Sequence, residues 1–376
     1  MEPFALYLKK YFHANPHLGA RDRRNVRHLC YAWWRLGKAG TQLSENERMA
    51  IAFFLSYQDN DKFSQRFFKN DYLLNSITEP INLKWEIVVK QYDGLFSLSD
   101  VFPFQSLIET SINTHDFVLD GFNRRKLWTR INRHDKQKVL DFFYSENVPF
   151  RISDVNEFAM QLPDDYDIIN ALPFQNGWLE VQDLSSQLLG SWYRPIDGQK
   201  WLDACAASGG KSLQLLDRNN NIDLTVTDIR ESILKNLNFR FKRNNTRFYQ
   251  SAIVDWSNPQ EGLKKIYNEQ FDAVIADVPC SGSGTWARSP EHKNQITEDK
   301  INAFSDLQFT ISSNLIPTLK KGGSLFYSTC SVYQTENHLV VDRLIKHFSL
   351  ELIQSKIIDG SKSQADTMFV AELKKQ

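Results

Sequence analysis

The sequence DACAASGGKS spans Asp203 to Ser212 and joins two stretches of different character. Lys200–Ala204 is a short apolar run typical of a buried strand, and helical spacing begins at Lys211. A turn of small residues between a strand and a helix lets a ligand approach the backbone N–H groups of the helix N-terminus. This stretch therefore predicts a ligand site at the end of a strand.

Two nucleotide-binding motifs match this turn only in part. Gly210, Lys211 and Ser212 match the end of a P-loop, but Cys205 stands where that motif needs its first glycine. The dinucleotide fingerprint G-x-G-x-x-G is not found here either. Asp228 closes the next expected strand, where a carboxylate accepts hydrogen bonds from a ribose diol, and a helix N-cap is the other interpretation. Together, the turn and Asp228 favour a nucleoside-containing cofactor without pyrophosphate.

Strands and helices alternate around this turn. Further buried strands are expected at Leu224–Thr227, Phe271–Ala276 and Ser324–Tyr327, with helices at about 230–243, 299–319 and 341–348. Alternation of this kind predicts an α/β fold with a mostly parallel sheet that is covered on both faces. Because such sheets bind ligands beyond the carboxyl ends of their strands, the residues directly after each strand form the candidate site.

Two cysteines follow neighbouring expected strands. Cys280 lies in the segment DVPCSGSG, Asp277–Gly284, and Cys330 lies in the segment STCS, Ser328–Ser331. An isolated buried cysteine usually packs as a small apolar residue. Two thiols at strand ends, beside Asp277 and a flexible Gly/Ser loop, instead favour nucleophilic chemistry. Cys30 and Cys205 are interpreted as packing residues.

Composition sets wider limits on the class of protein. The 376 residues predict two to three domains, and Lys+Arg balances Asp+Glu at 45 each, so anions must be bound by local patches. The four cysteines form no C-x-x-C pair, and neither a disulfide scaffold nor a metal site is expected. The sequence shows no signal-peptide h-region and no apolar run long enough to span a bilayer. We expect a cytoplasmic protein with free thiols.

Two basic stretches are candidate anion-binding patches. From Ala20 to Lys38 an apolar helical stripe leaves the remaining surface mostly to Arg23, Arg24, Arg27 and Arg35. These arginines form either a solvated helix face or an anion-binding surface. The second stretch, Arg124–Lys138, has seven basic residues against Asp135 alone and contains an expected strand at 127–132. Its Trp128 belongs either to a core or to a nucleic-acid surface.

The motifs together resemble the Nop/Sun family of RNA cytosine-5 methyltransferases, in its RsmB-like branch. The family's cofactor loop, D-x-C-A-A-P-G-G-K-T, is found here with Ser208 for Pro and Ser212 for Thr. Its D-x-P-C-S-G-x-G and S-T-C-S motifs are complete, and its V-Q-D-x-x-S-Q segment is found at Val181–Gln187. The paired P-C and T-C motifs make this resemblance highly specific.

The resemblance implies three domains and an activity. Residues 1–120 correspond to a helical, NusB-like RNA-binding domain, 121–176 to a small α+β RNA-binding module, and 177–376 to a Rossmann-like catalytic domain. The implied enzyme transfers a methyl group from S-adenosylmethionine to carbon 5 of cytosine in RNA. Ribosomal RNA is the default substrate of this branch, and transfer RNA is the main alternative. Since the target base must leave its stack, we expect single-stranded or locally opened RNA.

The resemblance also implies roles for individual residues. Cys330 adds to carbon 6 of cytosine, Cys280 assists release, and Asp277 hydrogen-bonds the base. The residues implied at S-adenosylmethionine, with Asp228 at the ribose and Asp255 near the adenine, are Asp203, Cys205, Ala206, Ala207, Ser208, Gly209, Gly210, Lys211, Asp228, Asp255 and Asp277. Two other classes stay open: a catalytically silent RNA-binding ribosome-assembly factor, and a Rossmann-type methyltransferase of small molecules or proteins. Neither class has a use for both thiols.

Overall fold

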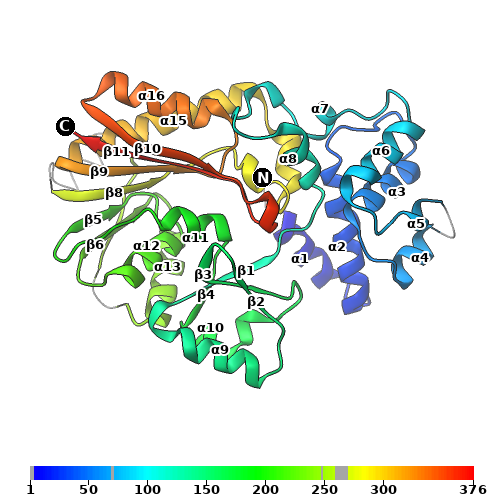
Figure 1. The fold of residues 1–376 in the computed structure, drawn as a ribbon, viewed down its shortest axis with the longest axis horizontal. Helices are drawn as coiled ribbons and strands as arrows, with labels where there is room; N and C mark the ends of the chain where they lie inside the picture. The colour runs from blue at the N-terminus through cyan, green and yellow to red at the C-terminus, as the bar shows by residue number, and fades with distance from the viewer. Residues whose placement is uncertain (1–3, 69–71, 247–248, 259–269) are drawn as a thin grey trace. The chain divides into compact units, whose positions relative to one another are not determined.

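A computed structural model describes residues 4–68, 72–246, 249–258 and 270–376 (Figure 1). The chain folds into two compact units. The first consists of Met1–Arg125 with Thr285–Thr297, and the second of Lys126–Gly284 with Glu298–Gln376. In the described part of the chain, no helix combines the length and the apolar character needed to cross a membrane.

The first unit is helical, as the sequence predicts. Its helix α3 buries a run of consecutive apolar side chains that includes Phe53 and Phe54, as a helix inside a core does. The helix α3 begins in a capping box, in which Ser44 and Glu47 satisfy each other's backbone N–H groups. The α-helices of this unit are α1 (Phe4–Ala14), α2 (Ala20–Arg35), α3 (Glu45–Ser56), α4 (Lys62–Phe68), α5 (Tyr72–Asn75), α6 (Ile81–Gln91), α7 (Leu98–Val101) and α8 (Thr114–Asp120).

Arg35, at the end of α2, is buried, whereas the sequence predicted that it lies at the surface. The side chain is buried, and its Nε and Nη2 donate to the Ala287 carbonyl at 3.3 and 3.0 Å. Lys293 returns a bond from its Nζ to the Arg35 carbonyl at 2.8 Å. The sequence could not show this, because the partners lie more than 250 positions away. Arg24 and Arg27, in contrast, are exposed as expected, and Arg23 is half-buried.

The second unit begins with a small antiparallel sheet in the order β2-β3-β1-β4. Its strands are β1 (Leu127–Ile131), β2 (Arg151–Ser153), β3 (Asn156–Leu162) and β4 (Leu179–Val181), with helices α9 (Lys136–Ser145) and α10 (Leu172–Gln175). One core joins Ile131, Met160 and Phe143 of these elements. Trp128 is buried elsewhere, beside Leu184, and its Nε1 donates to the Ser363 carbonyl at 3.1 Å. Of the two interpretations of Trp128, the structure supports the core.

The basic run Arg124–Lys138 is largely neutralised by acidic partners, most of which lie outside it. Arg130 is buried and forms an ion pair with Asp217 at 3.0 Å. The remaining described pairs are Arg125–Asp120, Lys126–Asp164, Arg133–Asp217, Lys136–Glu157 and Lys138–Asp135. Fewer positive charges of this segment are therefore free to bind an anion than its sequence suggests.

The larger sheet of the second unit has seven strands in the order β10-β11-β9-β8-β5-β6-β7. The pairs from β9 to β7 are parallel, whereas β11 pairs antiparallel with β9 and β10. The strands are β5 (Lys200–Asp203), β6 (Asp223–Asp228), β7 (Gln250–Ile253), β8 (Phe271–Asp277), β9 (Leu319–Thr329), β10 (Leu350–Ile358) and β11 (Met368–Lys375). The helices are α11 (Leu184–Gly190), α12 (Gly210–Arg218), α13 (Glu231–Arg243), α15 (Glu298–Leu315) and α16 (His338–His347).

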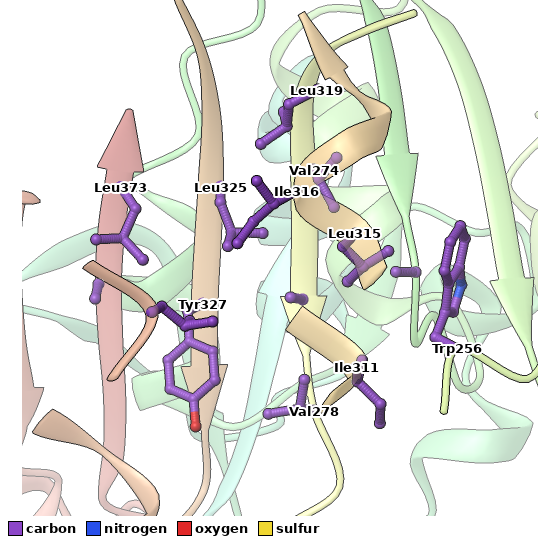
Figure 2. Packing of buried hydrophobic residues seen from close by; sticks show 14 of the residues in the cluster. Trp256, Val274, Val278, Ile311, Leu315, Ile316, Leu319, Leu325, Tyr327 and Leu373 are labelled. Carbon is purple, nitrogen blue, oxygen red and sulfur yellow. The ribbon is translucent and has the colours of Figure 1, made fainter. Parts of the chain in front are cut away.

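Successive residues of the central strands point to opposite faces of this sheet. In β8, Val274 and Ala276 join a core with α15 and α16, and Ala273 and Ile275 join a core with α12 and α13. Figure 1 shows these two pairs of helices on opposite faces, and Figure 2 shows the first core, where Leu315 packs near Val274. The prediction of a Rossmann-like α/β fold with a mostly parallel sheet is confirmed.

This strand order decides which loops can meet. Because β5 lies between β8 and β6, and β9 lies next to β8, the carboxyl ends of all four strands share one edge. Asp203, Asp228 and Asp277 each stand at the end of one of these strands, and Cys330 directly follows β9. The sheet therefore gathers the predicted site residues at one place.

Candidate active site

The turn between β5 and α12 follows a backbone path that favours small residues. Ala207 and Gly209 have φ angles of 45° and 81°, in the left-handed region. A Cβ at Gly209 would lie 2.5 Å from Cε1 of Phe241, so a larger residue does not fit there. The Ala206 N–H donates to the Thr227 carbonyl at 2.9 Å, which ties the turn to β6.

Asp203 lies buried at the root of this turn. Its Oδ2 accepts a hydrogen bond from Ser212 Oγ at 2.6 Å. Its Oδ1 is also buried and has no hydrogen-bond partner among the residues that the structure describes. The pKa of Asp203 is raised to about 7, mainly by burial. The hydrogen bond from Ser212 lowers this pKa, and the charge of Asp277 raises it further. Since buried polar atoms are nearly always paired, Oδ1 marks a place for a donor from a ligand.

Asp228 lies beside the turn and receives four hydrogen bonds. The Ala207 N–H donates to Oδ2 at 3.0 Å, and Arg230 donates from its backbone and Nε to Oδ1 and from Nη2 to Oδ2. Burial opposes ionisation of Asp228, but the hydrogen bonds and charge of Arg230 outweigh it and lower the pKa. The four bonds fill the acceptor positions of the carboxylate. A diol would therefore bind here by displacing the Arg230 guanidinium, whose side chain is 57% exposed.

Asp255 has a weaker link to the turn than Asp228 does. Asp255 follows β7, and its Oδ1 accepts from the N–H and Oγ of Ser257 at 2.9 and 2.6 Å. These contacts are local, and no described hydrogen bond joins the Asp255 side chain to the turn. Ser208, which replaces the family's proline, accepts from Arg240 Nη1 at 3.2 Å. Burial raises the pKa of the Cys205 thiol, as suits a packing residue.

Lys211 and Asp277 join the turn to the P-C loop. Lys211 Nζ lies 2.6 Å from Asp277 Oδ2, and Ser328 Oγ donates to Asp277 Oδ1 at 2.9 Å. Burial opposes the charge on Lys211, but Asp277 outweighs it and raises the pKa of the ammonium group. Both side chains keep some exposure, 13% for Lys211 and 27% for Asp277, so a ligand can reach the pair.

The two thiols lie together at the ends of β8 and β9. Cys280 Sγ is 3.2 Å from Cys330 Sγ, and both are free cysteines. The hydrogen bond to Cys330, with burial second, raises the pKa of Cys280 well above its ordinary value. This direction favours the arrangement in which Cys280 keeps its proton and donates it to the sulfur of Cys330.

Gly284 holds the two thiol loops close together. Its N–H donates to the Cys330 carbonyl at 2.9 Å, and its carbonyl accepts from the Thr367 N–H at 3.0 Å. A Cβ at Gly284 would overlap the Thr367 carbonyl. The Gly/Ser loop that the sequence suggests is flexible is therefore fixed at Gly284 by close backbone contacts.

Sequence reasoning did not single out three residues that touch this constellation: Arg230, Ser328 and Glu336. Ser328 belongs to the STCS segment, so its motif was a usable signal. Arg230 and Glu336 gave none, because an arginine two positions after Asp228 and a glutamate six positions after Cys330 follow no pattern with chemical meaning. Their contacts depend on how the loops fold.

Comparison with known sequences gives one family. The family described as 16S rRNA methyltransferase RsmB/F matches residues 191–374. Ribosomal RNA small subunit methyltransferase B of Vibrio vulnificus is 31% identical over 246 residues, covering 64% of this chain and 54% of that protein. The probable ribosomal RNA small subunit methyltransferase B of Bacillus subtilis is 32% identical over 220 residues, covering 58% and 48%. The chain spans about half the length of these curated relatives.

Solved structures share the fold. The structure titled PH0851 has a TM-score of 0.76 at 19% identity and covers 100% of this chain and 95% of its own. A methyltransferase homolog protein from Pyrococcus horikoshii has a TM-score of 0.63 at 19% identity, covering 72% and 93%. NSun6 from the same organism, solved with SFG, has a TM-score of 0.64 at 14% identity, covering 72% and 96%.

The match to the family model falls on the residues that build the site. The matched segment 191–374 contains the turn, the Lys211–Asp277 pair and both thiols. The RsmB/F family is described as methyltransferases of 16S rRNA, and one of the three solved structures is titled a methyltransferase homolog protein. Residues 191–374, just under half of the chain, are thus similar to the RsmB/F family of 16S rRNA methyltransferases.

Proposed function

We propose that this chain methylates carbon 5 of cytosine in ribosomal RNA, with S-adenosylmethionine as the methyl donor. The observation that carries the proposal is the pair of free thiols, Cys280 and Cys330, 3.2 Å apart at two neighbouring strand ends. A methyltransferase that acts on an already nucleophilic atom needs no thiol, whereas carbon 5 of cytosine must first be activated by covalent addition. The names of the relatives favour ribosomal RNA over transfer RNA.

The turn around Gly209 fits the proposed cofactor. The buried, unpartnered Oδ1 of Asp203 suits a cationic donor, and the ionised Asp228 suits a ribose diol. Lys211 and the turn complete the residues that would hold the group, and Asp255 remains a prediction for the adenine. When bound, S-adenosylmethionine supplies an electrophilic methyl group on a sulfonium.

The thiols and Asp277 divide the chemistry between them. Cys330 forms a bond to carbon 6, and the electron pair this displaces makes carbon 5 a nucleophile for the methyl group. Asp277 must carry or share a proton to hydrogen-bond ring N3. Cys280 then promotes loss of the carbon-5 proton, which re-forms the double bond and releases Cys330.

Removing each thiol separately tests this mechanism. Cys330→Ala should abolish methylation and any covalent adduct, because the ring is never activated. Cys280→Ala should still allow attack and methylation but stall elimination, so the RNA stays bonded to Cys330 and migrates slowly in denaturing electrophoresis. Cys30→Ala, on the half-buried thiol of α2, is the matched control and should behave like wild type.

Four results would count against the proposal. An adduct that accumulates in Cys330→Ala instead would exchange the two roles. If Cys280→Ala binds RNA but forms no adduct, the two-thiol mechanism does not operate. Transfer of labelled methyl groups to protein extract rather than to total RNA would place the chain among protein methyltransferases, and no transfer at all would favour the silent assembly factor.

The target RNA can be identified in cells. Bisulfite sequencing of total RNA should show a cytosine that loses protection in a deletion strain, and ribosomal RNA is the expected location. A lost site in transfer RNA would move the substrate to the alternative class. The expected cytoplasmic location also stays a prediction, which a tagged chain in fractionated cells would test.

A further inference from the structure

Glu336 is a buried carboxylate for which the proposed chemistry has so far given no role. It ends a short 3-10 turn, Gln334–Glu336, after the STCS segment, and its side chain is completely buried. Among the residues that the structure describes, no lysine or arginine forms an ion pair with it. Burying a carboxylate without a cation costs stability, so its neighbours must explain its presence.

Four neutral donors converge on this carboxylate. Oε1 accepts from the Ser281 N–H at 2.7 Å and from Gln308 Nε2 at 3.0 Å. Oε2 accepts from Ser281 Oγ at 2.5 Å and from Ser331 Oγ. Ser281 directly follows Cys280 in the chain, and Ser331 directly follows Cys330. One side chain thus bonds to both thiol loops.

The neighbouring residues support the same two loops. Gln308 of α15 also donates to the carbonyl of Pro279, the residue before Cys280, at 2.9 Å. Asn337 accepts from Thr329 Oγ1 at 2.6 Å and donates to the Ser331 carbonyl at 3.0 Å, on the two sides of Cys330. The peptide around each thiol is therefore held on both sides.

We propose that Glu336 is a positioning residue that fixes the separation of Cys280 and Cys330 by bonding the serine after each of them. This inference rests on the proposed function for its chemical consequence but not for its geometry. One thiol must reach carbon 6 while the other acts at carbon 5 of the same ring. If the distance between the thiols varied, neither would stay aligned with its carbon. The charge of Glu336 also contributes to the raised pKa of Cys280.

Glu336→Gln tests this role, with Glu372→Gln as the matched control. Glutamine keeps the shape of Glu336 but has one acceptor oxygen in place of two. Glu372 is a half-buried carboxylate of β11 that accepts from Gln354 Nε2 at 2.9 Å, away from both thiols. Adduct formation with RNA that carries 5-fluorocytosine is the first readout, because fluorine at carbon 5 cannot leave as a proton. Misplacing a reacting group by about 1 Å costs on the order of 100-fold, and we expect a loss of that size in the adduct rate of Glu336→Gln.

A second readout needs no activity. Dibromobimane fluoresces when it bridges two nearby thiols, and peptide mapping shows which cysteines it joins. Bridging of Cys280 to Cys330 should fall in Glu336→Gln, while single alkylation of Cys330 and binding of S-adenosylmethionine persist. If the wild type bridges its thiols but forms no adduct with RNA, the proposed function fails and the bridging comparison still tests Glu336.

Two results would overturn the inference. The first is a folded Glu336→Gln variant with the bridging yield and adduct rate of wild type. The second comes from the variant Ser331→Ala, which removes one donor to Glu336. This variant also provides the test if Glu336→Gln does not fold. Ser331→Ala should lower bridging, and combining it with Glu336→Gln should add little, because both act through one contact. Unchanged bridging in Ser331→Ala, or full additivity of the two changes, would contradict a clamp through the serines.

Discussion

Asp228 and Arg230 make a specific prediction at the scale of single residues. If the ionised Asp228 holds a ribose diol, Asp228→Ala should weaken cofactor binding by roughly tenfold to a hundredfold, since a hydrogen bond to a charged group contributes about 1.5–3 kcal/mol. Isothermal titration of the full chain with S-adenosylmethionine measures this change. Arg230→Ala is the control, because its guanidinium occupies the acceptor positions a diol would take. Its affinity should equal that of wild type or exceed it.

Either of two outcomes would contradict this assignment. An unchanged dissociation constant in Asp228→Ala would place the ribose elsewhere. A loss in Arg230→Ala as large as that in Asp228→Ala would mean that their ion pair, rather than a free carboxylate, is what the cofactor needs.

Asp203 predicts a pH dependence of cofactor binding. Burial raises its pKa to about 7, so in the free protein Asp203 takes up a proton as the pH falls below 7. A cationic cofactor group favours the ionised form, so binding must then expel that proton. Affinity should therefore fall as the pH drops from about 7 towards 5.5, by up to about tenfold per pH unit, and level off above 7. Calorimetric titrations across this range measure the slope.

Asp203→Asn provides the comparison. It keeps the size of the side chain but cannot ionise, so its affinity should be lower than that of wild type at pH 7.5 and nearly flat across the range. A wild-type profile without a slope, or the same slope in Asp203→Asn, would assign the titration to another group.

At the scale of elements, β8 was predictable from its buried apolar run, whereas β4 and β10 at sheet edges were not. Phe271–Ala276 was expected from six consecutive residues that bury both faces, and β8 (Phe271–Asp277) follows closely. The strand β4 spans only Leu179–Val181, too short for a period to show. In β10 most residues are exposed or half-buried, so its sequence resembles a solvated segment. Both strands form because the backbone of a neighbouring strand pairs with them by hydrogen bonds.

Glu180 of β4 joins the small sheet to the helix α13 through two ion pairs. It is buried and accepts from Arg240 Nε and Arg243 Nη2, both at 2.6 Å. The burial of Glu180 opposes ionisation, but these arginines and Asn244 outweigh it and lower its pKa. Glu180→Gln should destabilise the protein by about 3 kcal/mol, the low end for a broken buried pair, because both arginines keep some contact with water. Urea denaturation measures the difference.

A matched glutamate makes the Glu180 result interpretable. Glu157 bonds Lys136 at 2.6 Å in the same small sheet, but its side chain is 68% exposed. Glu157→Gln should leave the urea midpoint unchanged, because exposed ion pairs are screened by water. If Glu180→Gln were equally silent, the network would not hold β4 against α13.

At the scale of the whole molecule, a residue of the site was predictable when its place in a motif also fixed its place in the fold. Asp203, Asp277 and Cys330 end or follow strands, so the sheet brought them together as expected. Arg35 and Glu336 were out of reach, because their burial depends on segments that meet only after folding. Counting charges failed over Arg124–Lys138 partly for the same reason, because Asp217, Asp164 and Glu157, which pair with it, lie far away in sequence.

The expectation of an RNA-binding surface therefore concentrates on α2. Arg24 and Arg27 are exposed, whereas Arg35 is buried against Ala287. Reversing both charges, Arg24→Glu with Arg27→Glu, should weaken RNA binding and reduce the slope of log affinity against log salt. Single-stranded RNA releases counterions with a slope of about 0.7 per phosphate contact, so losing two contacts lowers the slope by about 1.4. Lys62→Glu with Arg66→Glu changes the net charge equally on exposed residues of α4 and should leave the slope unchanged.

Equal slopes for wild type and both variants, measured over a salt series, would make Arg24 and Arg27 a solvated helix face. Equal losses in the two variants would show that net charge matters rather than a surface on α2.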